Sequence, residues 1–162
     1  MKLKNFNIQY KIEEYNSGKT RRFILQIGDV VLKPGDTIGL QAPDGTLYKL
    51  ARRDDNYGWN SEYLLFKKGE CYSQVDEEID YENMELISFT RQLEHTTGRC
   101  YYNTTVIVAY NNQNNIENYT QEESEEHSPC GYRKKPIEVP EDLIKLGFNT
   151  AFFYNSWCDS SD

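Results

Sequence analysis

Side chains that could do chemistry are few in this sequence, and the two histidines are the first to consider. Nucleophilic catalysis needs a base beside its nucleophile, yet neither His95 nor His127 lies near a Gly-x-Ser-x-Gly motif. Glycine-rich phosphate-binding motifs are also absent. His95, in the segment Glu-His-Thr-Thr-Gly, is predicted to lie in a turn. We therefore expect a protein without catalytic residues, metal or cofactor.

The four cysteines are the next candidates for chemistry. Cys71, Cys100, Cys130 and Cys158 are widely spaced and form no Cys-x-x-Cys pair. His127 and Cys130 have the spacing of two zinc ligands, but a closed zinc site needs two more, and the usual second close pair is missing. Four cysteines in a secreted chain would suggest two disulfides, with three possible connectivities. Because the N-terminal residues do not resemble an export signal, the sequence favours reduced thiols.

The most distinctive pattern is the distribution of acidic residues. The net charge is −8, which disfavours direct binding to nucleic acid or to an anionic membrane. Residues 1–70 carry a net charge of +3 and residues 71–162 a net charge of −11. Two runs of acids with neighbouring tyrosines supply the candidate contact residues. These are Asp76, Glu77, Glu78, Asp80, Tyr81, Glu82, Glu117, Tyr119, Glu122, Glu123, Glu125 and Glu126.

The two acidic runs have a structural and a functional interpretation. Like charges that lie close together repel each other, so solvated loops that keep the protein soluble would explain them. The functional interpretation is a non-catalytic inhibitor or immunity-type protein that blocks a basic partner, such as a nuclease or a nucleic-acid-binding enzyme. The acids would mimic nucleic acid and speed association, and the tyrosines would anchor the contact.

A carbohydrate-binding, lectin-like β-sandwich is the main alternative, because the chain is rich in aromatic rings and in Asn and Asp. Its candidate contacts are Tyr57, Trp59 and Asn60, or Trp157 near the end of the chain. Calcium could assist, since oxygen ligands alternate through Asp54, Asn56, Asn60 and Glu62, although the spacing of an EF-hand is not reproduced. An acid-pair hydrolase is a third interpretation, for which the sequence selects no particular pair of acids.

The elements that would position these residues are mostly strands. Alternating apolar residues and turn signals mark them. The predicted strands cover residues 6–12, 23–31, 37–41, 46–51, 63–66, 71–75, 84–94, 100–110 and 150–157. Residues 84–94 also fit a helix, because Met84, Ile87 and Arg91 could share a helical face, but a strand is favoured. The segment 96–98 is predicted to turn the chain into the strand over 100–110, which is expected to be central. Pro140, two acids and Gly147 predict one short helix.

Length and composition fit one domain over residues 1–162. Aliphatic residues are scarce, but 13 Tyr and 2 Trp can supply buried area. The segment 111–128 has one aliphatic residue and is predicted to be a flexible acidic loop. No apolar run approaches the about 20 residues that cross a bilayer, so a cytoplasmic protein is expected. The predicted fold is mainly β, a single antiparallel β-sandwich or barrel-like domain with one short C-terminal helix.

Overall fold

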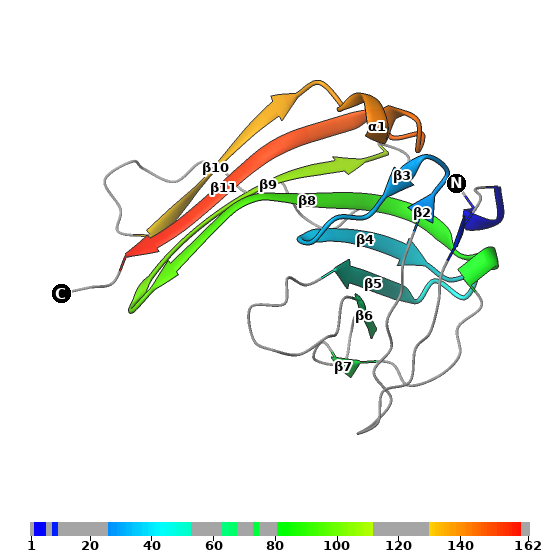
Figure 1. The fold of residues 1–162 in the computed structure, drawn as a ribbon, viewed down its shortest axis with the longest axis horizontal. Coiled ribbons are helices and arrows are strands. Elements are labelled where there is room, and N and C mark those ends of the chain that lie inside the picture. Colours follow the sequence, from blue (N-terminus) through cyan, green and yellow to red (C-terminus); the bar gives the residue numbers. More distant parts are fainter. Residues whose placement is uncertain are drawn as a thin grey trace.

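The computed structural model describes residues 2–5, 8–9, 26–52, 63–67, 73–74, 81–111 and 130–159. These residues form two antiparallel sheets (Figure 1). The small sheet has the order β1-β2-β3, and the large sheet has the order β10-β11-β9-β8-β4-β5-β6-β7. The large sheet is open and does not close into a barrel. The prediction of a mainly β, antiparallel fold is therefore confirmed, in a sandwich-like form.

Most of the predicted elements are present. The strands are β1 (Ile8–Gln9), β2 (Gln26–Ile27), β3 (Val30–Val31), β4 (Asp36–Gln41), β5 (Leu47–Arg52), β6 (Tyr63–Lys67), β7 (Ser73–Gln74), β8 (Glu85–Gly98), β9 (Tyr101–Tyr110), β10 (Cys130–Ile137) and β11 (Thr150–Asp159). The described helices are the 3₁₀ turns η1 (Leu3–Asn5) and η2 (Tyr81–Asn83) and the α-helix α1 (Glu141–Ile144). The expected C-terminal helix is α1, and β9 is an interior strand, as expected.

The turn between β4 and β5 shows how local sequence determines chain reversal. Its Pro-Asp-Gly segment places Gly45 at a φ of 89°, a conformation that glycine adopts without steric cost. The N–H of Gly45 donates to the carbonyl oxygen of Ala42 at 2.9 Å. The N–H of Thr46 donates to Asp44 Oδ1, also at 2.9 Å. Asp and Gly thus close the turn through bonds that the sequence specifies locally.

Three sequence-based assignments need correction. The predicted strand over 23–31 is a hairpin, β2 and β3, because Gly28 has a φ of 58° and reverses the chain. The predicted turn at 96–98 is wrong, since β8 continues through these residues and the chain turns at Arg99 and Cys100. Strand β10 was not predicted. The predicted flexible loop over 111–128 lies outside the described residues, except for Asn111.

The hydrophobic core lies at one end of the large sheet. Ile38, Leu40, Leu50, Phe89 and Ala109 of that sheet are buried in the core cluster. The opposite layer consists of η1, the small sheet and α1 with the residues that follow it. Its buried side chains are Leu3, Ile27, Val30, Leu32, Leu143, Leu146 and Phe148. The core is therefore a two-layer sandwich of limited extent.

An ion-pair network connects the two layers at the edge of the core. Arg91 of β8 donates from Nε to Asp36 Oδ1 at 3.4 Å and from Nη1 to Asp142 Oδ2 of α1 at 2.8 Å. Asp36 also accepts the N–H of Lys33 at 2.8 Å. Burial of Asp36 raises the pKa of its carboxyl above the ordinary 3.8, while the hydrogen bond from Lys33 and the charge of Arg91 oppose this. The network fastens α1 to the sheet.

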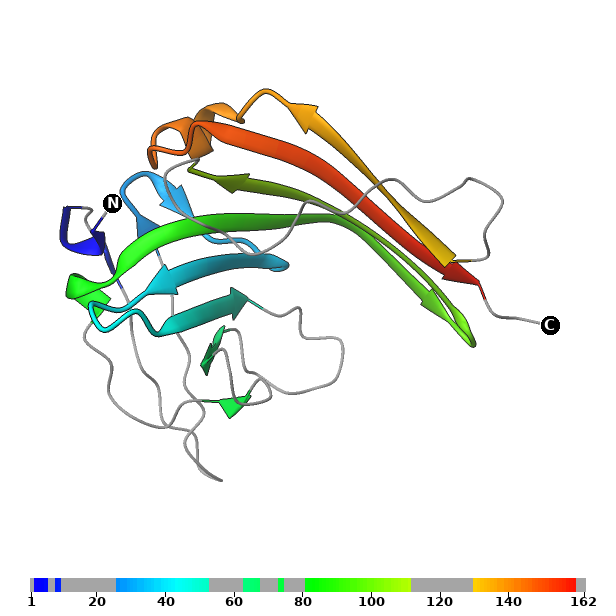
Figure 2. The same ribbon diagram turned by 180° about the vertical axis from the view of Figure 1, so that it is seen from behind.

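Four strands extend beyond this core. In Figures 1 and 2 the small sheet and α1 lie at one end of β8, β9, β10 and β11, and the other ends of these strands continue away from them. We call this part, residues 92–107, 130–135 and 153–159, the outer sheet. Residues 92–98 of β8 are all exposed, whereas Leu86 and Phe89 of the same strand are buried. The outer sheet thus presents a broad surface on a rigid hydrogen-bonded scaffold.

Candidate binding surface

The register of the strands divides the outer sheet into two faces. Side chains alternate between faces along a strand, and directly paired residues share a face. Ala109 of β9 and Ala151 of β11 are paired and point into the core. The residues two, four or six positions away from them along the same strands therefore lie on the core-facing side of the sheet. One face of the outer sheet therefore continues from the core-facing side, and it carries Trp157. The other face carries three tyrosines.

The face with Trp157, which we call the Trp157 face, combines an aromatic ring with amides and hydroxyls. Trp157 of β11 is paired with Asn103 of β9, and Asn103 is paired with Thr96 of β8. One step toward the core, Asn155 is paired with Thr105 and with Arg133 of β10. The guanidinium carbon of Arg133 lies 5.8 Å from the centroid of the Trp157 ring. Trp157 and both asparagines are half-buried.

Asn155 organises the polar groups of the Trp157 face. Its Nδ2 donates to Asn103 Oδ1 at 2.7 Å, to Thr105 Oγ1 at 2.9 Å and to the carbonyl oxygen of Thr104 at 3.2 Å. Among the described residues, these bonds leave the Oδ1 of Asn155 and the Nδ2 of Asn103 without partners. One acceptor and one NH₂ group with unused hydrogen-bonding capacity therefore lie on the face that carries Trp157.

The opposite side of the outer sheet, the tyrosine face, is stabilised by ring contacts. Tyr132 of β10 stacks on Tyr154 of β11, with ring centroids 6.0 Å apart. Lys134 Nζ lies 4.5 Å from the ring centroid of Phe152. Tyr102 is 42% exposed. His95 belongs to this face, and its Nδ1 lies 2.7 Å from Thr104 Oγ1.

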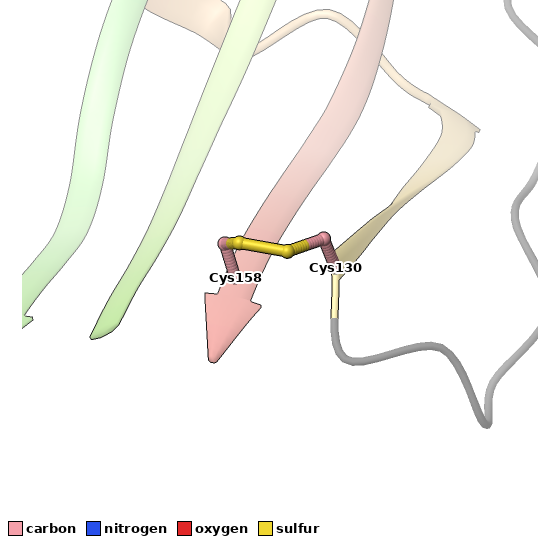
Figure 3. The surroundings of a disulfide bond; sticks show 2 residues. All are labelled: Cys130 and Cys158. Atoms are coloured by element: carbon pink, nitrogen blue, oxygen red, sulfur yellow. A yellow bond between two sulfur atoms is a disulfide. The ribbon is translucent and has the colours of Figure 1, made fainter. Parts of the chain in front are cut away.

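A disulfide closes the end of the outer sheet. Cys130 begins β10 and Cys158 lies directly opposite it in β11 (Figure 3). The prediction of reduced thiols is therefore wrong for this pair, because β-sheet register brings two cysteines together that are 28 residues apart in the chain. A zinc site using His127 and Cys130 is also wrong, since Cys130 is already bonded. Cys100 is exposed at the turn between β8 and β9.

The structure covers few of the residues that the sequence singled out. Of the two acidic runs, Tyr81 and Glu82 lie in η2, and Glu82 is exposed. The other ten candidate contacts lie outside the described residues: Asp76, Glu77, Glu78, Asp80, Glu117, Tyr119, Glu122, Glu123, Glu125 and Glu126. Tyr57, Trp59 and Asn60, with the calcium candidates Asp54, Asn56 and Glu62, lie outside them as well. Trp157 is the one carbohydrate candidate that the structure places.

The metal-ligating and titratable side chains of the described ranges are the next to consider. These ranges contain no group of three or more His, Cys, Asp or Glu side chains that could hold a metal ion. The carboxyl with a raised pKa, Asp36, is buried in β4 and paired with Arg91, so it is a poor candidate for the general acid of an acid-pair hydrolase. His95, predicted in a turn, lies within β8.

Sequence reasoning named Trp157 but missed its neighbours, Asn103, Asn155 and Arg133. One signal was available, because Asn is depleted in strands, and both asparagines interrupt segments with strong strand character. Their convergence on Trp157 depends on pairing between β9 and β11, and Asn103 and Asn155 are 52 residues apart in the chain. A single chain segment therefore could not reveal the patch.

Comparison with known proteins does not identify this chain. No protein-family model, curated protein or solved structure matches it. In the part of the chain that the structure describes, no helix has the length and apolar character needed to cross a membrane. The outer sheet itself is therefore the basis for any functional proposal.

Proposed function

We propose that this protein is a non-catalytic carbohydrate-binding protein and that the Trp157 face is its binding surface. One observation carries the proposal: Trp157 shares a sheet face with Asn155 and with Asn103, its partner in the register, and Asn155 Oδ1 and Asn103 Nδ2 have no partner among the described residues. An indole ring offers a flat apolar surface for the C–H groups of a sugar ring. The amide groups offer a donor and an acceptor for its hydroxyls.

The preorganisation of the patch supports this assignment. Asn155 is held by three hydrogen bonds from its Nδ2, so its carbonyl oxygen is fixed in direction before a ligand arrives. Binding groups that are already ordered lose little conformational entropy when a ligand binds. A half-buried polar group with an unused donor or acceptor also gains more binding free energy from a ligand hydroxyl than a fully solvated group does.

The disulfide bears on where such a protein would work. Disulfides persist mainly in oxidising compartments, and Cys130–Cys158 lies one residue from Trp157. It therefore supports an extracellular or periplasmic role, where glycans are abundant, over the cytoplasmic location expected from the sequence. The cytoplasmic location expected from the sequence goes with the second candidate function, the inhibitor or immunity-type protein described below.

A glycan array, followed by titration of the best ligands, tests the main proposal. Trp157→Ala is expected to lose at least about tenfold in affinity, corresponding to about 1.4 kcal/mol. The matched control is Tyr102→Ala, which removes an exposed ring from the tyrosine face of the same sheet. Running the array with and without calcium separates a calcium-assisted site from this one. Absence of any sugar binding at millimolar concentrations would eliminate the proposal.

A second candidate function is the inhibitor or immunity-type protein, which would use the acidic runs against a basic partner. The charge distribution favours it. The described ranges contain twelve Lys and Arg against ten Asp and Glu, a net charge of +2. Since the whole chain carries −8, the remaining residues carry −10. The acidic character thus resides outside the described sheets, in segments that include both runs.

The second candidate is tested by affinity capture at low and high salt. A basic nuclease or nucleic-acid-binding protein that elutes with salt would support it, since contacts between exposed charges are screened by ions. Reversing the charges of Asp76, Glu77, Glu122 and Glu123 should then slow association at low salt. Unchanged association kinetics of this variant with the captured partner would show that the acidic runs make no contact with that partner.

A further inference from the structure

Strand β10, at the edge of the large sheet, carries three consecutive cations, Arg133, Lys134 and Lys135. Because side chains alternate along a strand, Arg133 and Lys135 lie on the Trp157 face and Lys134 lies on the tyrosine face. The contacts agree with this, since Arg133 approaches Trp157 and Lys134 approaches Phe152. Two positive charges therefore border the proposed sugar site along one side.

The two cations of the Trp157 face reach the surface. Arg133 and Lys135 are exposed, and Lys135 forms no ion pair with the described residues. The outer sheet contains four Lys and Arg and only two acids, Glu94 and Asp159. Its local charge is therefore positive although the whole chain is acidic. Both acids share the Trp157 face, since Glu94 is paired with Thr105 and Asp159 follows Trp157 by two residues in β11. Neither lies on β10, so the positive charge that attracts an anion is confined to the β10 side of this face.

The position of the cations relative to the indole ring defines the ligand. Gly131 is paired with Trp157, so no side chain from β10 stands directly between the ring and the sheet edge. Arg133 follows two residues later and Lys135 two residues after that, at about 7 Å per step. A sugar chain that stacks on Trp157 and runs along β10 and β11 would bring substituents of successive rings to the two cations.

We propose that the Trp157 face selects acidic carbohydrates, with a carboxylate or sulfate group of the sugar bound by Arg133 and Lys135. This inference rests on the proposed carbohydrate-binding function and specifies its ligand class. A guanidinium offers paired N–H donors that match a carboxylate or sulfate, and Lys135 adds a second charge. Single-stranded nucleic acid, which also combines planar groups with negative charge, is disfavoured, since two cations provide few phosphate contacts.

The test compares hexagalacturonate with its fully methyl-esterified form, two ligands that differ in charge and share the same sugar backbone. Heparin hexasaccharide serves as a sulfated probe and oligothymidylate as a nucleic-acid probe. The variant Arg133→Gln/Lys135→Gln removes both charges and keeps part of each side-chain stem. Lys134→Gln is the matched control, because it removes one charge of the same strand on the opposite face. Circular dichroism checks that the variants are folded.

The wild-type protein is expected to bind an acidic hexasaccharide at least about tenfold more tightly than the ester, given the usual strength of charge-assisted hydrogen bonds. Arg133→Gln/Lys135→Gln should reduce acidic binding to the level of the ester, and Lys134→Gln should not. Equal affinity for acid and ester would overturn the acidic selectivity while leaving the carbohydrate function standing. No binding of any sugar would overturn both. Tighter binding of oligothymidylate would reassign the face to nucleic acid.

Discussion

The core end and the outer end of the large sheet share the same four strands and the same hydrogen-bond ladder, but they differ in what covers them. At the core end, Phe89 of β8 and Ala109 of β9 are fully buried beneath α1 and the small sheet. At the outer end, residues 92–98 of β8 are exposed. A sheet satisfies its backbone groups through its own ladder, so strands can extend beyond a core without unpaired donors or acceptors.

This difference shows how the protein can separate stability from recognition. Burial of apolar area is the main favourable contribution to folding, and it is concentrated at the core end. The outer sheet adds hydrogen bonds, ring contacts and one disulfide, which maintain its shape at small hydrophobic gain. Its side chains therefore have more freedom to serve a ligand. Four predictions test this contrast.

The largest expected effect is the loss of a core ring. Phe89→Ala should lower the free energy of unfolding by about 3–5 kcal/mol, because a fully buried aromatic side chain leaves a cavity. Trp157→Ala, at a half-buried site of the outer sheet, should cost less than about 2 kcal/mol. Denaturation by urea measures both values. Equal losses would contradict the proposed division between the two regions.

Removal of the disulfide should loosen only the outer end. Cys130→Ser/Cys158→Ser is expected to cost about 2–4 kcal/mol through the entropy of the unfolded chain. Hydrogen exchange should accelerate for the amides of β10 near Gly131. The amides of β4 should lose only as much protection as the fall in the global free energy of unfolding accounts for. The wild-type protein under reducing conditions is the control. Exchange that accelerates equally across the whole sheet would show that the ends are one cooperative unit.

Glycines in the two regions should respond differently to a methyl group. In β4, a Cβ on Gly39 would collide with Ser88 Oγ and lie 3.3 Å from Ile87 Cγ1. Gly39→Ala should therefore cost about 1–3 kcal/mol, partly recovered by Ser88→Ala. In the outer sheet, a Cβ on Gly98 meets only Tyr101, at 3.8 Å or more, so Gly98→Ala is expected to be tolerated. Thermal denaturation of the three variants measures the effect.

The smallest expected effect is a pH dependence from Asp36. Because burial raises the pKa of this carboxyl in the folded protein, folding favours its protonated form. The stability of the wild type relative to Asp36→Asn should thus fall as pH rises above 3.8 through the raised pKa, and become constant at higher pH. Urea midpoints of both proteins across this range give the difference. A difference that increases with pH would mean that the ion pair with Arg91 outweighs desolvation.

Local sequence signals predicted which strands and helices exist better than they predicted where each one begins and ends. Turn signals on both sides identified β4 over 37–41, and a continuous apolar run at 106–109 identified β9 as a central strand. The hairpin at Gly28 was missed, because apolar residues on both sides of it maintained an apparent strand. The extension of β8 through Gly98 was also missed, since Thr-Thr-Gly has turn composition and only pairing with residues 101–103 of β9 keeps it extended.

The candidate site was only partly predictable. Trp157 was among the carbohydrate candidates because of its residue type alone. Asn103, Asn155 and Arg133 were not, because they come from three strands, and their relation to Trp157 is defined by register. The acidic runs, which led the sequence-based interpretation, lie almost entirely outside the described residues and stay a prediction.

By itself, the sequence determined the fold class, the turns at Gly45 and Gly147 and the uneven distribution of charge, since these depend on composition and on neighbours along the chain. Only the tertiary structure decided that Cys130 is bonded to Cys158, that Trp157 lies beside two asparagines and that Arg133 and Lys135 share its face. The physical reason is register. A shift of one residue between β10 and β11 would separate Cys130 from Cys158 and move Arg133 and Lys135 away from the face of Trp157.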